Sequence, residues 1–368
     1  MTKSDSMLRY GSKSIQAYKG SAKYHDKYYE LWEKQANVIW TMHDISMDQD
    51  AVDYAADNEE NRRVIETVFK TFTSNDVSIN SAYSVIANLV NPSATTMMLM
   101  EYASVENVHI TSYSLLTDTL GFDKEFYEEF LHDPVLISKF KMLQEVIPKS
   151  YEEVLFEEDY NIVVAHRVHT RDVLLFIFVF SLCIEGLSLF AQFAILLNFG
   201  RGGKYSGMTD VNLYSQLDES FHVEGNATIF NDIVAEYPDY MTSEFRDELM
   251  WYINYFVNQE LDLVQHRIFT MESKELKSDD GTTTLSLQEM EDYIKYLANF
   301  RLEQVNLPQL FPNTRRNPLL WIDEMLLASS NVNFFTNTPT EYVNNSTKGT
   351  RGDVREMFRE MKEKEKNA

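Results

Sequence analysis

The segment "ASVENVHITSYSLL", from Ala103 to Leu116, carries polar side chains at spacings that could support chemistry. Glu106, His109 and Tyr113 follow one another at intervals of three and four residues, among largely apolar neighbours. This spacing places all three on one face of a helix. If that face points into the protein, each polar group needs a partner, because buried polar groups are rarely left unpaired.

The Glu-x-x-His pattern of this segment occurs repeatedly along the chain. Spacing by three on a helix lets the carboxylate and the imidazole reach one ion, so each pair is a candidate metal half-site. The pairs are Glu106/His109, Glu129/His132 and Glu219/His222.

Sequence context argues against two of the histidine-containing segments as metal sites. Glu129/His132 follows "KEFYEEF" and ends at Asp133–Pro134, which indicates an acidic helix end in water. His166 and His169 in "AHRVHTRD" also have ligand-like spacing, but the arginines beside them disfavour a cation. We expect those two histidines in a loop or at a helix start.

Glu106/His109 and Glu219/His222 lie in apolar helical segments, and Glu185 lies inside the most apolar segment of all. A buried carboxylate must be neutralised by a shifted pKa, an ion pair or a metal. Few Lys or Arg residues in these segments are available for ion pairs. A shared cation therefore explains the set, and helical bundles that hold two metals use this pattern of inward carboxylates and Glu-x-x-His pairs.

One further carboxylate is needed to complete that pattern, and we expect it from the helix around Val64–Val90. Glu66 and Asp76 are the candidates. Asp76 is favoured because it lies in the middle of the helix, whereas Glu66 follows the charged stretch "DNEENRR". The alternative that "TSND" around Asp76 caps or breaks a helix stays open.

Long helices must position these groups, and the sequence predicts an all-α protein. Glycine and proline are scarce, at 12 and 8 residues, and apolar residues recur at helical spacing over long segments. The expected helices cover roughly residues 22–40, 59–92, 96–118, 124–148, 150–158, 168–198, 208–236, 243–270, 286–303 and 317–330.

The segment Val173–Phe199 is long and apolar enough to be a candidate for a membrane span. However, Glu185 at its middle is costly in lipid, and no second span exists with which it could pair. We therefore predict that this helix is the buried centre of a large bundle and that the protein does not enter a membrane.

The composition of the whole chain narrows its class. The 368 residues are 44% hydrophobic and 13% aromatic, enough for a large core. A net charge of -24 argues against a nucleic-acid partner. The lone Cys183 excludes an internal disulfide, and the N-terminus lacks the apolar run of a signal peptide, so we expect a cytoplasmic protein.

The end of the chain changes character. We predict one domain over residues 1–336 and a polar, charge-rich tail over residues 337–368. Within the tail, an apolar stripe at helical spacing suits the groove of a partner, although the same pattern also fits a solvated helix. The stripe consists of Val354, Met357, Phe358 and Met361.

The ordered set of these residues resembles the radical-generating small subunit of class I ribonucleotide reductase, from about Lys27 to Tyr342. The matching stretches follow the family's order and separations. They are "EKQANVIW" ending at Trp40, then Asp76, "ENVHITSY", "CIEG" and "DESFH".

The resemblance implies a ferritin-like helical bundle with a dinuclear metal site. It assigns Asp76, Glu106 and His109 to one metal and Glu185, Glu219 and His222 to the other, or across to it. Two iron ions are the expected cofactor, with manganese or a mixed manganese/iron pair as the alternative.

The resemblance also implies a route for an oxidising equivalent. Tyr113 would hold a radical after the metals react with dioxygen, and Trp40 would connect through Asp218 to the metal-bound His109. Tyr342 in the tail would pass the equivalent to a separate large subunit, which reduces ribonucleoside diphosphates. A homodimer is expected on the same ground.

Two departures from the family's pattern concern the neighbourhood of Tyr113. Ser215 and Leu189 stand where bulky apolar residues, commonly Ile and Phe, line the family's radical pocket, although Phe193 is kept. A hydroxyl there would admit water or donate a hydrogen bond. The competing functions are a ligand-binding oxidase of the same bundle architecture and a metal-storage or structural partner.

Overall fold

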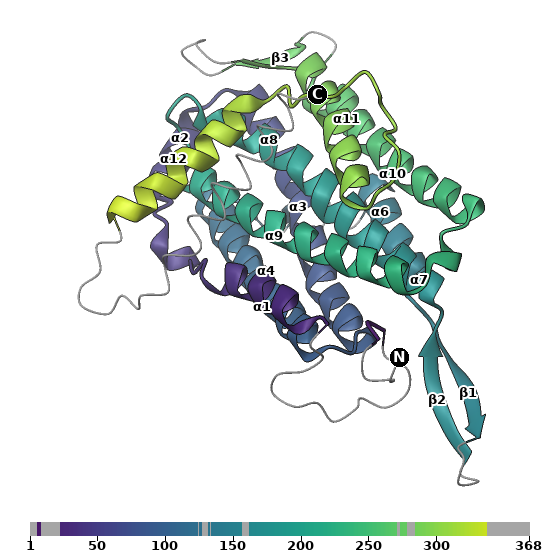
Figure 1. Ribbon diagram of the computed structural model, residues 1–368. Coiled ribbons are helices and arrows are strands. Elements are labelled where there is room, and N and C mark those ends of the chain that lie inside the picture. Colours follow the sequence, from purple (N-terminus) through teal and green to yellow (C-terminus); the bar gives the residue numbers. More distant parts are fainter. Residues whose placement is uncertain are drawn as a thin grey trace, which may run out of the picture.

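The computed structural model describes the backbone of residues 6–8, 23–123, 125–126, 132, 134–156, 162–270, 273–277 and 284–336. Helices dominate these ranges (Figure 1). The α-helices are α1 (His25–Ala36), α2 (Asp48–Ala56), α3 (Glu59–Leu89), α4 (Ser93–Thr119), α6 (Pro134–Val146), α7 (Thr170–Ile177), α8 (Phe190–Gly200), α9 (Ser206–Glu236), α10 (Ser243–Leu263), α11 (Leu287–Gln304) and α12 (Leu320–Thr336). Shorter helical pieces are η2 (Met42–Asp44), η4 (Pro238–Tyr240) and the π-helical η3 (Phe178–Leu189) and η5 (Val264–Ile268).

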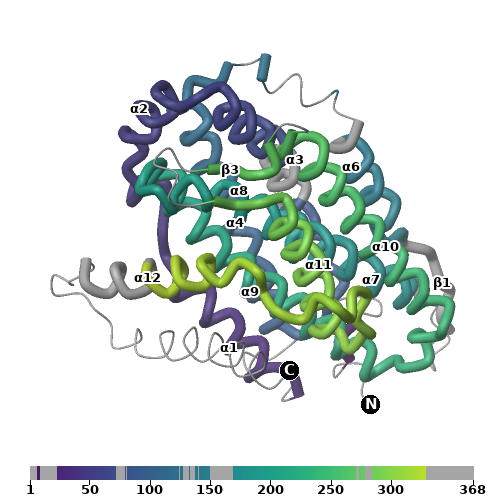
Figure 2. Tube along the Cα trace, turned by 90° about the horizontal axis from the view of Figure 1, so that it is seen from above, coloured from purple at the N-terminus to yellow at the C-terminus, as the bar shows by residue number. Residues whose placement is uncertain are grey.

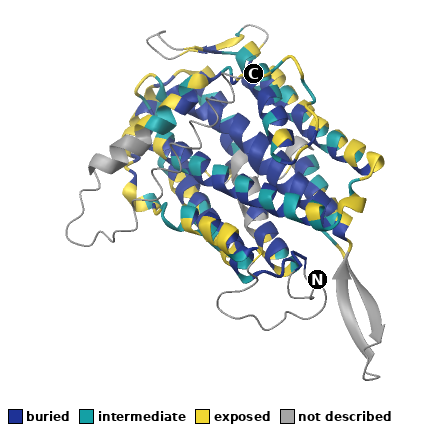
Figure 3. Ribbon diagram, viewed as in Figure 1, coloured by how far each residue is buried: buried dark blue, intermediate teal, exposed yellow. Residues whose placement is uncertain are grey.

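The centre of the bundle is the continuous helix formed by α7, η3 and α8. Helices α3, α9, α10 and α11 pack around it, and buried residues gather along it (Figure 3). Its Thr170–Gly200 span is apolar and long enough to cross a membrane, yet its most apolar window is 100% buried by the rest of the protein. The predicted role as the buried centre of a bundle is therefore confirmed.

The long helices that were expected to carry the chemistry are confirmed with small shifts at their ends. The segment 208–236 is α9, 96–118 is α4, and 59–92 is α3. Helix α12 lies along α9 on the outside of the bundle (Figure 2). Within the predicted segment 124–148, residues 125–126 are helical, and α6 begins at Pro134, a residue that favours the first turn of a helix.

The predicted helix over residues 150–158 is wrong. Strand β1 (Ser150–Phe156) pairs antiparallel with β2 (Ile162–Val168), and Ser150 lies opposite Val168. This hairpin projects from the bundle beside α7 (Figure 1). His166 therefore lies on a strand rather than in a loop, whereas His169 precedes the first residue of α7, as expected for a helix start. A second small sheet pairs β3 (Glu275–Lys277) with β4 (Thr284–Ser286).

The start of α9 is fixed by acidic side chains of α2, a helix that the sequence did not predict. Asp50 accepts hydrogen bonds from the backbone N–H groups of Gly207, at 2.9 Å, and Met208, at 2.7 Å. Asp53 accepts from the N–H of Tyr205, whose φ of 52° lies in the left-handed region. These bonds cap a helix terminus whose N–H groups would otherwise be unpaired.

The predicted tail, residues 337–368, lies outside the described residues, and so do Tyr342 and the apolar stripe within it. The division into one domain and a tail remains a prediction.

Candidate metal centre

Three helical elements bring carboxylates and imidazoles to one buried place inside the bundle. Helix α4 supplies Glu106 and His109, η3 supplies Glu185, and α9 supplies Glu219 and His222. All five side chains are buried. One ligand-type atom from each of Glu106, Glu185, Glu219 and His222 lies within 4.8 Å of the others, which is a cation-sized cluster.

His109 and His222 lie between the carboxylates. His109 Nδ1 is 3.3 Å from Glu106 Oε2 and 3.4 Å from Glu219 Oε1. His222 Nδ1 is 3.0 Å from Glu106 Oε1 and 3.3 Å from Glu219 Oε2. Each Glu-x-x-His pair therefore faces the other across the centre.

Several buried polar atoms of this cluster lack a well-oriented hydrogen-bond partner, which indicates that the cluster can hold a metal. Glu106 Oε1, Glu219 Oε2 and both ring nitrogens of His222 are buried and lack a well-oriented hydrogen-bond partner among the described residues. Leaving such atoms unpaired costs free energy, more so for charged groups. Carboxylate and imidazole groups are ligands of iron and manganese, so cations at this place would satisfy them.

The pKa values describe the charge balance without a metal. Burial acts to raise the pKa of Glu106, but the charges and hydrogen bonds of His109 and His222 outweigh it and lower the pKa to about 2. Burial acts to lower the pKa of His222, but Glu219 and Glu106 outweigh it and raise the pKa to about 10. Burial, reinforced by Glu219, raises the pKa of Glu185 well above its usual range. Protons held by His222 and Glu185 therefore offset part of the negative charge of the carboxylates in the site.

Asp218 links the cluster to Trp40 on its outer side. Trp40 lies in the loop after α1 rather than at the end of a helix, and its Nε1 donates to Asp218 Oδ2 at 2.8 Å. The same oxygen is 3.1 Å from His109 Nε2, and Gln35 Nε2 donates to Oδ1 at 2.7 Å. The carboxylate therefore leaves the Nδ1 of His109 facing the centre, which is how an outer carboxylate orients a ligand histidine.

Tyr113 is buried one helical turn beyond His109. Its hydroxyl donates to Asn212 Oδ1 at 3.2 Å, and its ring lies 6.3 Å from that of Phe69. Ser215 and Leu189 are buried as well, and the Oγ of Ser215 has no hydrogen-bond partner among the described residues. Asn212, which the sequence reasoning missed, therefore supplies a polar contact to the phenol.

Three more residues of the site were missed, all around Glu185. Tyr83, Ser181 and Asn226 form a buried hydrogen-bonded group against its carboxylate.

A signal for all four missed residues, Asn212 included, is present in the sequence, because each lies at helical spacing from a predicted ligand. Tyr83 is seven residues after Asp76, Ser181 four before Glu185, Asn226 four after His222, and Asn212 seven before Glu219.

Several predicted site residues cannot be joined to the cluster. Asp76 lies in α3, but its side chain is outside the described part of the structure, as is all of Tyr342. Glu66, the less favoured candidate, accepts a hydrogen bond from Tyr54 at 2.6 Å. His132 is exposed in a turn, in agreement with its exclusion as a ligand.

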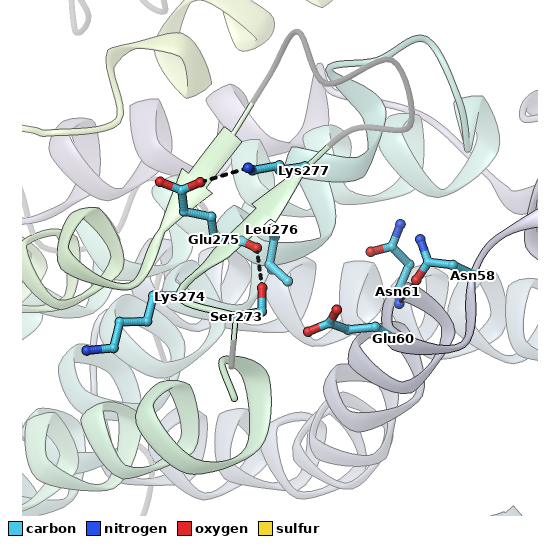
Figure 4. A pocket seen from close by; sticks show the side chains of 8 residues that line it. All are labelled: Asn58, Glu60, Asn61, Ser273, Lys274, Glu275, Leu276 and Lys277. Atoms are coloured by element: carbon cyan, nitrogen blue, oxygen red, sulfur yellow. Dashed lines mark hydrogen bonds and ion pairs between the residues drawn. The ribbon is translucent and has the colours of Figure 1, made fainter. Parts of the chain in front are cut away.

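A surface pocket of about 520 Å³ lies between the start of α3 and strand β3 (Figure 4). Its lining is polar, and Glu275 and Lys277 form an ion pair of 3.2 Å at its edge. The lining shares no residue with the carboxylate and histidine cluster.

Comparison with known proteins decides the family. The family model for "Ribonucleotide reductase, small chain" matches residues 22–318. The chain belongs to this family. A similar relative is a probable ribonucleoside-diphosphate reductase small subunit of Invertebrate iridescent virus 6, 29% identical over 349 residues that cover 90% of this chain and 95% of the relative. The protein is accordingly a ribonucleotide reductase small chain, a member of an oxidoreductase family.

Solved structures that resemble this small subunit of ribonucleotide reductase have the same ferritin-like helical bundle. The R2 subunit from Clostridium botulinum has a TM-score of 0.73 at 19% identity, and the match covers 87% of this chain and 94% of that one. An R2-like ligand-binding oxidase with a Mn/Fe cofactor has a TM-score of 0.61 at 16% identity, covering 80% and 98%. The predicted all-α, ferritin-like fold is confirmed.

Proposed function

We propose that the buried cluster holds two metal ions and that their function is to generate a radical on Tyr113 for use by the large subunit. The ligands would be Asp76, Glu106, His109, Glu185, Glu219 and His222. The observation that carries this proposal is the convergence of buried Glu106, Glu185, Glu219 and His222 ligand atoms within 4.8 Å.

The metals are most simply iron, with manganese as the alternative, because both accept mixed carboxylate and imidazole ligands. When bound and reduced, they would supply reactivity toward dioxygen and hence a one-electron oxidant for a nearby phenol. The protein's own contribution is to exclude water, since Tyr113 is only 2% exposed, and to hold the phenol through Asn212.

The route out of the centre runs through His109, Asp218 and Trp40. The ring of Trp40 lies 5.8 Å from that of His109, and its N–H donates to the carboxylate that also contacts His109. Asp218 would orient His109 and let charge and proton move together along this chain. Tyr342 would be the next member, in the tail that we propose binds the large subunit.

The assembly that follows from this function is a homodimer of small subunits that works with a large subunit in the cytoplasm. The other functions considered, an oxidase acting on a small ligand and a metal-storage protein, give no role to Trp40, whose contacts with Asp218 and His109 favour the radical route.

Tyr113→Phe tests the proposal. Protein loaded with iron or manganese in the presence of dioxygen is examined by electron paramagnetic resonance and assayed with its large subunit. We expect the variant to bind metal, to lack the tyrosyl signal and to have no reductase activity. Tyr293→Phe, a buried tyrosine on α11, is the control that should keep both. Full activity of Tyr113→Phe would rule out the proposed role.

Deleting residues 350–368 tests the docking role of the tail. We expect the affinity for the large subunit to fall by at least tenfold, because the apolar stripe from Val354 to Met361 would be lost. The affinity is measured by titrating the large subunit, with metal content checked in parallel. An unchanged affinity would refute the docking role and leave the metal site untouched.

A further inference from the structure

Glu185 differs from Glu106 and Glu219, the other described carboxylates of the centre, because hydroxyl groups of the protein donate hydrogen bonds to both of its oxygens. Tyr83, on α3, donates to Oε1 at 2.5 Å. Ser181, one helical turn before Glu185, donates to Oε2 at 2.8 Å. Both donors are fully buried and therefore shielded from bulk solvent.

Asn226 on α9 supports both hydroxyl groups. Its Nδ2 lies 3.1 Å from Ser181 Oγ and 3.4 Å from Tyr83 Oη, and its side chain is fully buried. Because Asn226 lies one turn after His222, one helix fixes both the ligand imidazole and the group that holds the ligand carboxylate. The rings of Tyr83 and His222 are 5.5 Å apart and nearly perpendicular.

Glu106 and Glu219 are held differently, by an imidazole rather than by hydroxyl groups. Glu106 Oε1 lies 3.0 Å and Glu219 Oε2 3.3 Å from His222 Nδ1, although neither contact is a well-oriented hydrogen bond. A cation that binds His222 would replace these contacts, whereas the hydroxyl groups on Glu185 can stay in place. The two halves of the centre are therefore built differently.

We propose that Tyr83, Ser181 and Asn226 are positioning residues that hold Glu185 as a fixed ligand, and that they set the affinity of the metal position formed by Glu185 and His222. This inference rests on the proposed function. Each carboxylate oxygen has more than one lone pair, so an oxygen that accepts a hydroxyl proton can still bind a cation. Outer partners of this kind change metal affinity by about 10- to 100-fold.

The test is an anaerobic titration of the full-length protein with Mn²⁺ alone, in which electron paramagnetic resonance reports unbound Mn²⁺. The native protein should bind two equivalents per chain. In Tyr83→Phe, which keeps the ring and removes the hydroxyl, one equivalent should bind at least tenfold more weakly while the other is unchanged. Ser181→Ala should act in the same direction on the same equivalent.

Tyr102→Phe is the matched control. The ring of Tyr102 lies 4.5 Å from that of His222, but its buried hydroxyl has no hydrogen-bond partner among the described residues. Removing it changes the same neighbourhood without touching Glu185, so both Mn²⁺ equivalents should bind as in the native protein. Thermal unfolding without metal checks that each variant is folded. If Tyr83→Phe does not fold, the Mn²⁺ titration of Ser181→Ala tests the role of the hydroxyl groups.

Two results would overturn the inference. One is native binding of both equivalents in folded Tyr83→Phe and Ser181→Ala. The other is equal weakening of both equivalents, or the same weakening in Tyr102→Phe, which would indicate general loosening of the core. If the native protein itself binds no Mn²⁺, the proposed metal centre fails rather than the role of Tyr83.

Discussion

At the scale of single residues, the phenol of Tyr113 is held by an amide. Its hydroxyl donates to Asn212 Oδ1, and the amide nitrogen of Asn212 donates in turn to the carbonyl of Met208 at 2.6 Å. This chain of bonds fixes the orientation of the amide, with its oxygen rather than its nitrogen facing the phenol. An amide oxygen accepts a hydrogen bond but is a poor acceptor for a whole proton, so Asn212 orients the ring rather than deprotonating it.

Asn212→Ala should therefore change the geometry of the radical rather than prevent its formation. With one anchor lost, the ring of Tyr113 can rotate, which alters the hyperfine pattern of the tyrosyl signal and shortens its lifetime. The missing hydrogen bond should also cost about 1 kcal/mol of stability. Electron paramagnetic resonance over time measures both spectral effects.

The control for that experiment is Ser112→Ala. Ser112 is buried beside Tyr113 in the sequence, and its Oγ has no hydrogen-bond partner among the described residues. Its removal should leave the signal as in the native protein. A native spectrum and lifetime in Asn212→Ala would show that Asn212 does not orient the phenol.

The residues of the site divide into those that the sequence could predict and those that it could not. Glu106/His109 and Glu219/His222 carry a local pattern, and Glu185 is conspicuous as a charge in an apolar helix. Tyr83 and Asn226 have no such pattern, because a tyrosine or an asparagine in a helix is ordinary until the facing helix is known. Helical spacing marks them only after the ligands have been chosen.

At the scale of elements, the π-helical segment η3 determines how Glu185 enters the centre. Segments of this kind are rare and concentrate at functional sites, because the wider turn shifts the side chains that follow it. Arg301 of α11 stabilises the segment by donating its Nε to the carbonyl of Gly186 at 2.8 Å. The buried guanidinium also lies over the rings of Phe190 and Phe300, at 4.5 and 5.1 Å from their centres.

Gly186→Ala should disturb this contact. A Cβ atom at this position would lie 2.6 Å from Arg301 Nε and 3.1 Å from the carbonyl of Ser181, so the guanidinium must move away from the helix. We expect a loss of about 2 kcal/mol in the free energy of unfolding, within the range for overpacked cores, together with weaker metal binding. Urea unfolding of the metal-free protein measures the first effect.

Ser188→Ala, in the same segment, provides the comparison for Gly186→Ala. Ser188 is buried and its Oγ lacks a hydrogen-bond partner among the described residues, so the smaller side chain should be tolerated within about 1 kcal/mol. Equal stability of Gly186→Ala and the native protein would show that the contact of Arg301 with Gly186 is not needed.

The hairpin of β1 and β2 shows where sequence reasoning about elements fails. "SYEEVLF" and "IVVAHRV" are rich in residues that favour strands, and the polar "EEDYN" between them suits a turn. A segment of seven residues is too short for periodicity to separate a helix from a strand, especially between long helices. Helices α3, α4 and α9, by contrast, are long enough for the helical period to fix their type.

At the scale of the whole molecule, distant parts of the chain meet at Glu236, the last residue of α9. Its carboxylate accepts hydrogen bonds from Ser6 Oγ and from the backbone N–H of Met7, both at 2.9 Å, and from the hydroxyl of Tyr24. Lys23 forms an ion pair with it at 3.0 Å. The first described residues of the chain are thereby fastened to the far end of the helix that carries Glu219 and His222.

This anchor should make the stability of the protein depend on pH. Burial acts to raise the pKa of Glu236, but the hydrogen bonds from Tyr24, Met7 and Lys23 outweigh it and lower the pKa below its usual value. A lowered pKa means that the ionised carboxylate stabilises the folded state. That contribution is complete above the unfolded pKa of about 4.3 and is lost as the pH falls through the lower folded pKa.

Glu236→Gln should therefore melt at a lower temperature than the native protein at pH 7, and the gap should narrow as the pH falls from about 5 toward 3. Glu30 is an exposed carboxylate on α1, and Glu30→Gln removes the same charge. Its free energy of unfolding should stay within about 0.5 kcal/mol of the native value at every pH in this range. Circular dichroism melts of the metal-free proteins at several pH values compare the three. A gap that stays constant across this range would mean that the N-terminal segment is held by packing, and that the charge of Glu236 contributes nothing to the anchor.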